Sequence, residues 1–209
     1  MIDSNKKVQD VLIAYHQRII AETTLMKSLP IEEGMKRRDE FLLPVGREVG
    51  QFLNSMVKAA SAKTILEIGT SYGYSTIWLA EAARQTKGKV ITLEIDAKKV
   101  AYARSQIEKA GLVAFVEFRI GDALESIRQA TETFDFVLVD IWKELYLPSL
   151  ELFLPKLSKE AYVIGDNMLH PPIHRKEANA YRAAIKATQV FDSVLLPIGS
   201  GIEVSKTKI

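Results

Sequence analysis

The sequence predicts a single α/β domain built on a Rossmann-like, seven-stranded, mostly parallel sheet with helices on both faces. From residue 64 onward, short apolar runs alternate with longer amphipathic runs, the pattern of strands that alternate with helices in a parallel sheet. The 209 residues suffice for one such domain, 1–209, with a sizeable core. Apolar residues make up 47% and charged residues 26% of the chain, as in ordinary globular proteins.

Residues 1–60 are expected to form a helical arm and cap ahead of a core at 61–209. One helix is predicted from apolar residues spaced at i, i+3, i+4, i+7 and i+11, which are Val8, Val11, Leu12, Tyr15 and Ile19. A second apolar face follows Pro44 and consists of Val45, Val49, Phe52, Leu53, Met56 and Val57. Between them, the charged residues 30–39 are predicted to be a mobile connection.

The core is expected to alternate strands with helices. The predicted strands are 64–68, 89–95, 115–119, 134–140, 160–165, 191–196 and 202–205. The predicted helices are 75–86, 97–110, 123–131, 145–153 and 174–188. The last two strands flank a Pro- and Gly-containing turn at 197–201 and should pair as an antiparallel hairpin. Ligands of such sheets bind beyond the carboxyl ends of the strands, so residues that follow strands are the candidates for a site.

Composition excludes several kinds of function. The chain has no cysteine, which excludes disulfides, thiolate metal sites and cysteine nucleophiles. A net charge of +2 gives no reason to expect a strong field for nucleic acid. The charged N-terminal residues do not resemble a secretory leader, and the longest uncharged stretch, Ile68–Ala80, is too short to span a bilayer. A cytoplasmic protein without a membrane partner is expected.

The most informative motif links the first two predicted strands. The first strand carries Glu67 near its end and continues into a turn with Gly69 and a helix that begins near Ser75; Glu94 ends the next strand. Glycine lets the backbone approach a ligand, and a strand-end carboxylate can accept both ribose hydroxyls. The pattern E-x-G-x-x-x-G departs from the dinucleotide pattern GxGxxG. It favours adenosine with a zwitterionic tail, as in S-adenosylmethionine, although a tight turn with Ser75 as a helix cap would look similar.

A second candidate for the same ligand follows the third predicted strand. There Asp122 could accept a hydrogen bond from the adenine amino group, while the backbone N–H of Ala123 reaches a ring nitrogen. Gly-Asp is also a common turn and Asp a common helix cap, so its position in the chain is its main support.

Polar residues also follow the fourth and fifth predicted strands. Adjacent parallel strands lie about 4.8 Å apart, so their ends could bring Asp140, Asp166 and Asn167 onto one hard cation, Mg²⁺ or Ca²⁺. Lys143 should face the same pocket, where a lowered pKa would let it act as a general base. As alternatives, the acids could be turn formers, Lys143 a surface lysine and Trp142 a pocket wall or a core residue.

The remaining candidates are weaker. His16, His170 and His174 do not have the spacing of a metal cluster. His170 precedes two prolines and is expected to be incidental to a rigid loop, and the role of the 168–175 loop stays open. Arg37 and Arg38 could close over an acidic substrate, but a solvated helix face is the favoured interpretation.

Together these motifs resemble the cation-dependent O-methyltransferases, which include catechol and caffeoyl-CoA O-methyltransferases. The resemblance runs from Leu43 to the C-terminus and is most specific at 66–75, 140–143 and 165–167. It implies a class I methyltransferase fold with the last strand antiparallel. It also implies contacts to S-adenosylmethionine from Val45, Glu67, Gly69, Thr70, Ser75, Glu94, Asp122, Ala123 and Asp140. Metal ligation by Asp140, Asp166 and Asn167 and a catalytic base at Lys143 are implied as well.

The implied reaction is methyl transfer to a hydroxyl of a small catechol-like aromatic acceptor whose two oxygens chelate Mg²⁺ or another hard divalent cation. Two alternatives stay open: a hydroxyuridine of tRNA as acceptor, with Arg37, Arg38 and Arg175 as a basic strip, or a methyltransferase-like binding protein without catalysis. The resemblance also implies a homodimer that uses residues 1–40. The chain departs from the family at Ile141, at 157–160 and at His170-Pro171-Pro172, and the last departure leaves the acceptor open.

Overall fold

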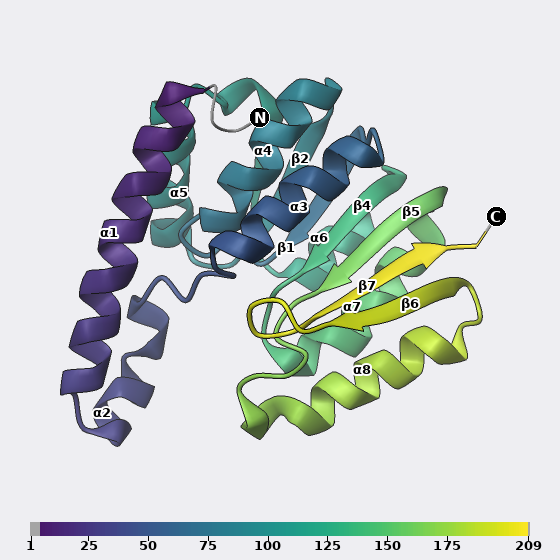
Figure 1. Cartoon of the computed structure of the whole chain (residues 1–209). Coiled ribbons are helices and arrows are strands. Elements are labelled where there is room, and N and C mark those ends of the chain that lie inside the picture. The colour runs from purple at the N-terminus through teal and green to yellow at the C-terminus, as the bar shows by residue number, and fades with distance from the viewer. Residues whose placement is uncertain (1–4, 209) are drawn as a thin grey trace.

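The computed structural model describes residues 5–208 and shows one seven-stranded sheet in the order β3-β2-β1-β4-β5-β7-β6 (Figure 1). The strands are β1 (Thr64–Ile68), β2 (Lys89–Glu94), β3 (Val116–Ile120), β4 (Phe134–Val139), β5 (Leu157–Gly165), β6 (Phe191–Leu196) and β7 (Ile202–Thr207). Strand β7 runs antiparallel to both neighbours, β5 and β6, and the other strand pairs are parallel. The predicted fold class and the closing hairpin are confirmed.

The central strands form because their apolar runs are covered on both faces of the sheet. In β1, Ile65 faces one buried hydrophobic cluster and Leu66 the other, since successive strand residues point to opposite faces. Leu66 is in register with Ile91 of β2 and Val137 of β4. This fixed register brings the carboxyl ends of the central strands to one edge of the sheet.

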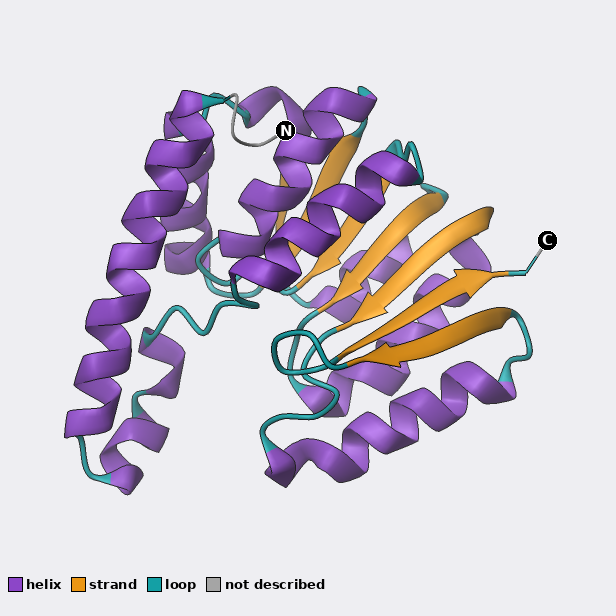
Figure 2. Ribbon diagram, in the orientation of Figure 1, coloured by secondary structure: helices purple, strands orange, loops and turns teal. Residues whose placement is uncertain are grey.

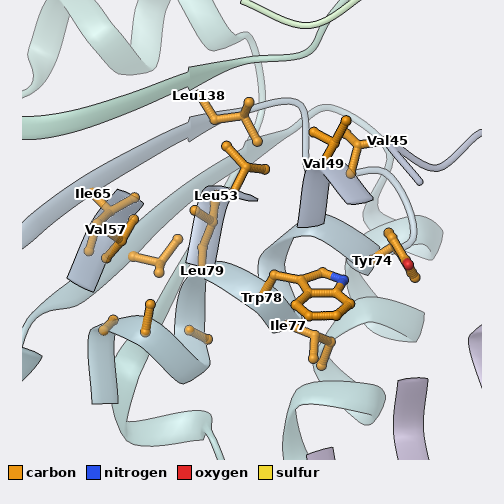
Figure 3. Close-up of a cluster of buried hydrophobic side chains, with 14 of the residues drawn as sticks. Val45, Val49, Leu53, Val57, Ile65, Tyr74, Ile77, Trp78, Leu79 and Leu138 are labelled. Atoms are coloured by element: carbon orange, nitrogen blue, oxygen red, sulfur yellow. The ribbon is translucent and has the colours of Figure 1, made fainter. Parts of the chain in front are cut away.

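Helices cover both faces of the sheet (Figure 2). They are α1 (Lys6–Ser28), α2 (Ile31–Lys36), α3 (Arg47–Ala59), α4 (Tyr74–Thr86), α5 (Ala97–Lys109), α6 (Ala123–Gln129), α7 (Tyr146–Phe153) and α8 (Arg175–Ala187). Helices α1, α3, α4 and α5 contribute to one buried cluster, and α6, α7 and α8 to the other. Figure 3 shows Val49, Leu53 and Val57 of α3 gathered with Ile77 and Trp78 of α4.

The N-terminal region is largely as expected, with one correction. Val8, Val11, Leu12 and Tyr15 are buried on α1. The prediction of a mobile connection at 30–39 is wrong, because this stretch forms α2 and the 3₁₀ turn η2 (Arg38–Glu40). Residues 1–4 of the predicted arm and residue 209 of the predicted core lie outside the described residues. Within 5–208, no helix combines the length and the apolar composition that a membrane crossing requires.

Candidate active site

A cavity of about 620 Å³ lies at the carboxyl edge of the sheet. Residues that end or follow five successive parallel strands line it: Gly69 after β1, Glu94 of β2, Gly121 after β3, Asp140 after β4 and Asn167 after β5. A smaller pocket shares part of this wall and adds the side chains of Val45, Thr70 and Ser75. The predicted position of a ligand site, beyond the strand ends, therefore coincides with this cavity.

The turn after β1 requires a glycine because two strand ends meet there. Gly69 has φ of +103°, and a Cβ atom on it would lie 2.0 Å from the carbonyl oxygen of Asp140. Its backbone N–H donates to the carbonyl of Leu93, 3.1 Å away in β2. The glycine thus lets β1, β2 and β4 converge on the cavity.

Glu67 lies behind this wall. Its side chain is fully buried and does not line the cavity. The carboxylate accepts hydrogen bonds from Ser75 Oγ at 2.5 Å and from Thr76 Oγ1 and Thr92 Oγ1 at 2.6 Å. Burial raises the pKa of Glu67 to about 7, although the three hydroxyls oppose the shift. Glu67 therefore ties the start of α4 and strand β2 to β1.

Glu94 connects the two halves of the predicted nucleotide motif. Its Oε2 accepts from the backbone N–H of Ser71 at 2.8 Å, and its Oε1 accepts from the N–H groups of Ile95 and Asp96 at 3.0 Å. The residue also lines the cavity. The carboxylate is thus oriented by backbone donors at the cavity wall.

Asp122 and Ala123 lie on the same wall at the start of α6. Asp122 caps the helix, since its Oδ1 accepts from the backbone N–H of Glu125 at 2.8 Å. Asp122 therefore both caps α6 and lines the cavity.

The ends of β4 and β5 bring Asp140, Asp166 and Asn167 together. The backbone N–H of Asp140 donates to Ile68, and that of Asp166 to Val139, both at 3.0 Å. Asp166 is 1% exposed, and its Oδ1 atom has no hydrogen-bond partner. Burial raises the pKa of Asp140, and burial together with the Asp140 charge raises the pKa of Asp166 to about 8.

This donor set fits a hard cation. Two carboxylates and an amide are oxygen ligands of the kind that Mg²⁺ and Ca²⁺ take, and a cation would offset the repulsion between the acids. Within residues 5–208, no three His, Asp or Glu side chains are arranged so that they alone could hold a metal ion. The candidate site therefore depends on the amide oxygen of Asn167 as its third protein ligand.

Lys143 is a buried lysine and not a surface one. It begins the 3₁₀ turn η4 (Lys143–Leu145) and is 6% exposed. Its Nζ donates to the carbonyl oxygen of Asp166 at 3.0 Å and lies 3.6 Å from the ring centroid of Tyr146. Burial lowers the pKa of Lys143 to about 8, against the opposing charges of the two acids. It adjoins the candidate cation site without being one of the cavity-lining residues.

The opposite wall comes from the N-terminal arm and from loops, and sequence reasoning missed most of it. Arg38, Phe41 and Leu43 line the cavity, together with Trp142 and Pro171. Arg38, for which a solvated helix face was the favoured interpretation, begins the 3₁₀ turn η2 and lines the cavity. No periodicity marked these positions, because they lie in a short 3₁₀ turn and in loops.

The remaining candidates lie elsewhere. Arg37 pairs with Glu40 at 2.9 Å and does not line the cavity. His170 is exposed and Arg175 begins α8, and neither lines the cavity.

Comparison with known proteins gives consistent matches. A family model described as O-methyltransferase matches residues 17–207. Catechol O-methyltransferase from Niastella koreensis is 32% identical over 157 residues, covering 73% of this chain and 70% of that protein. Caffeoyl-CoA O-methyltransferase 5 from Nicotiana tabacum is 31% identical over 182 residues, covering 77% and 75%.

Solved structures agree with the sequence matches. An O-methyltransferase from Bacillus cereus in complex with SAH superposes with a TM-score of 0.76 at 29% identity, over 100% of both chains. The O-methyltransferase TomG from Streptomyces achromogenes, in complex with SAM, gives 0.74 at 26% identity, over 83% of this chain and 86% of that one.

Proposed function

This chain belongs to the O-methyltransferase family and is an S-adenosylmethionine-dependent enzyme, and from this premise we propose that it methylates a small catechol-like acceptor with the help of a divalent cation. One observation carries the proposal: Asp140 and Asn167 line a cavity large enough for a small ligand, and the buried Asp166, which precedes Asn167, accepts a hydrogen bond from the buried Lys143. The relatives named for catechol and caffeoyl-CoA support a hydroxylated aromatic acceptor.

The cofactor would occupy the wall formed by the strand ends. We assign its adenosine part to Glu94, Asp122 and Ala123, and its amino-acid part to a smaller pocket lined by Val45, Thr70 and Ser75. Gly69 and Asp140 line both hollows and would lie between the two parts. Glu67 would contribute by holding Ser75 and Thr76 and not by contact with the cofactor.

The cation would be held by Asp140, Asp166 and Asn167. When bound, it supplies positive charge that lowers the pKa of a coordinated hydroxyl. The unpartnered Oδ1 of Asp166 is the strongest support for this assignment, because buried polar atoms normally have a partner.

Lys143 would act as the general base, as the sequence motif suggests. With a pKa of about 8, part of the lysine is neutral near physiological pH and its Nζ can accept the hydroxyl proton. The carbonyl of Asp166 orients this amine. Phe41, Leu43 and Trp142 would cover the acceptor ring and limit access of water.

The tRNA alternative requires a basic strip around the cavity. Of the three cations expected to form it, Arg38 lines the cavity, whereas Arg37 and Arg175 do not. A small acceptor is therefore the better-supported proposal. A homodimer through the arm and a cytoplasmic location remain predictions; the exposed Ile13 and Ile20 of α1 are consistent with a contact surface there.

The test is methyl transfer from labelled S-adenosylmethionine to caffeate, with Mg²⁺ and with EDTA. We expect EDTA to abolish transfer and Mg²⁺ to restore it. Asp166→Asn should weaken apparent metal affinity by more than about 100-fold, since loss of even an outer-shell partner costs about 10- to 100-fold. Asp192→Asn, on an acid whose side chain is 83% exposed in β6, is the matched control and should behave like the unsubstituted protein.

Two outcomes would contradict the proposal. Transfer that is insensitive to EDTA would exclude the cation from the reaction. Absence of transfer, with S-adenosylmethionine still bound in calorimetry, would exclude this acceptor class, and hypomodified tRNA would be the next acceptor to test.

A further inference from the structure

Two cations line the cavity, and only one of them has an acidic partner. Lys99 Nζ lies 4.0 Å from Asp39 Oδ1 and over the ring of Tyr72. Arg38 has its guanidinium carbon 5.3 Å from the ring centroid of Trp142. In the described part of the chain, Arg38 forms no ion pair with a carboxylate. A positive charge at the cavity wall is thus left without a counter-ion.

Arg38 lies on the acceptor side of the cavity. Its cation–π partner Trp142 is two residues from Asp140 and immediately precedes Lys143. The wall assigned to adenosine is instead formed by Glu94, Asp122 and their neighbours, at the ends of β2 and β3. A group bound by Arg38 would therefore belong to the molecule that receives the methyl group.

The other charges of the wall restrict where an anion could bind. Asp39, Glu94, Asp122 and Asp140 all line the cavity and would repel a carboxylate. A guanidinium that lies over an indole ring as a cation–π pair still has N–H donors that can bind a carboxylate in a bidentate fashion. Trp142 is 43% exposed, so the pair is open to the cavity and to solvent.

We infer that Arg38 binds the carboxylate of an acidic aromatic acceptor, so that the enzyme selects a catechol carrying a free carboxylate over its neutral ester. The inference rests on the proposed function in placing the hydroxyl pair at Asp140, Asp166 and Asn167. It adds the substrate class and the residue that selects it.

Binding tests the inference without depending on turnover. Caffeate and its methyl ester are titrated by calorimetry into protein saturated with SAH and Mg²⁺. Arg38→Gln should weaken caffeate binding by about 10- to 100-fold, the range of a hydrogen bond to a charged group, and leave the ester unchanged. Arg38→Lys keeps the charge and should recover part of the loss.

Arg37→Gln is the matched control, because Arg37 adjoins Arg38 in sequence, pairs with Glu40 and does not itself line the cavity. It should leave both ligands unaffected. The inference is overturned if Arg38→Gln affects acid and ester equally, if it affects neither, if Arg37→Gln causes the same loss, or if caffeate does not bind.

Turnover separates this inference from the proposed function. A carboxylate-specific loss of binding without methyl transfer by the unsubstituted protein would refute the proposed reaction and leave the role of Arg38 supported. Methyl transfer with equal KM values for acid and ester in both proteins would support the reaction and refute the role of Arg38. If both are right, Arg38→Gln raises KM for caffeate and leaves kcat nearly unchanged.

Discussion

The cavity has two walls that are built differently. At the strand edge, backbone hydrogen bonds extend the sheet into the wall, such as those from Gly69 to Leu93, from Gly121 to Glu94 and from Asp140 to Ile68. On the arm side, residues 38–45 have no such ladder and are held by isolated hydrogen bonds and by buried side chains such as Leu42 and Val45. The N–H of Leu42 donates to Glu22 at 2.7 Å, and the hydroxyl of Tyr72 donates to the carbonyl of Glu40 at 3.1 Å.

This difference in construction suggests that the two walls have different roles, one in the reaction and the other in the choice of acceptor. Residues fixed by a sheet ladder move only when the ladder opens, whereas segments held by a few exposed bonds open at much lower free energy. We therefore expect the strand edge to set the reaction and the cofactor, and the arm wall to set the acceptor. Arg38 and Phe41 of the arm wall line the main cavity but not the smaller pocket assigned to the cofactor, so substitutions there should change specificity without loss of cofactor binding.

The largest expected effect comes from removing the proposed general base, Lys143, beside the strand edge. Lys143→Met keeps the apolar stem and removes Nζ, so kcat should fall by about 100- to 10,000-fold, the usual contribution of a general base. SAH affinity should change little, because the cofactor wall is intact. Lys206→Met, on a lysine of β7 that lies over the Tyr162 ring of β5, is the control. Retention of kcat in Lys143→Met would refute the base assignment.

The next effect distinguishes crowding from backbone strain at the same edge. Gly69→Ala should lower the unfolding free energy by about 2–6 kcal/mol, since its Cβ would overlap the Asp140 carbonyl in addition to the positive-φ strain. Gly121→Ala also has positive φ but no atom within 4 Å of the new Cβ, so its cost should be about 1–3 kcal/mol. Urea unfolding measures both. Equal costs would show that the close approach of the strand ends does not constrain Gly69.

The third effect tests whether the buried Glu67 at the strand edge makes the free energy of unfolding depend on pH. Glu67 has a folded-state pKa of about 7 against its ordinary value of 4.5, so the folded protein holds the extra proton between these values. Its contribution to stability therefore falls as the pH rises through this window. Glu67→Gln should remove about 3 kcal/mol of that pH dependence.

The measurement is urea unfolding at pH values on either side of the window, for the unsubstituted protein and the Glu67→Gln variant. Glu81→Gln, on the neighbouring helix α4, is a control of opposite sign. Hydrogen bonds and the charge of Arg84 lower the pKa of Glu81 despite its burial, so its contribution is present at neutral pH and is lost as the pH falls. An unchanged slope in Glu67→Gln would show that Glu67 is ionised in the folded protein.

The two walls also differ in how well sequence reasoning predicts them. The strand edge was predicted because apolar runs and the residues that end them are local features, and a parallel sheet brings those ends together. The supporting role of Glu67 could not be predicted, since Thr76 and Thr92 come from two other elements. On the arm wall, Arg38 was named only as a less favoured candidate and Phe41 was missed, because contacts with residues far away in the chain, such as that of Arg38 with Trp142, bring this segment to the cavity.

The same reasoning explains the missed helix α2. Residues 31–36 have no apolar face, so periodicity could not predict a helix there. The signal was electrostatic: Glu32 and Glu33 lie in the first turn and Lys36 in the last, as the helix dipole favours. Such a short, exposed helix depends on its surroundings more than on its own sequence.

The smallest expected effect concerns the contact between the two walls. Tyr72→Phe removes the hydroxyl that donates to Glu40 but keeps the ring, whose centroid lies 4.1 Å from the guanidinium carbon of Arg18. Local opening of η2 should become easier by about 0.5–1.5 kcal/mol, measured as faster hydrogen exchange at the amide of Phe41, which donates to Arg38. Tyr162→Phe is the control.

Exchange in β1 should stay unchanged in Tyr72→Phe, because the sheet ladder does not depend on this bond. If the amides of β1 and Phe41 speed up together, the walls form one cooperative unit, and substitutions on the arm would disturb cofactor binding as well. If Phe41 alone speeds up, the arm is an independent unit. Its residues, Arg38 among them, can then be exchanged to alter the acceptor while the strand edge continues to hold the cofactor.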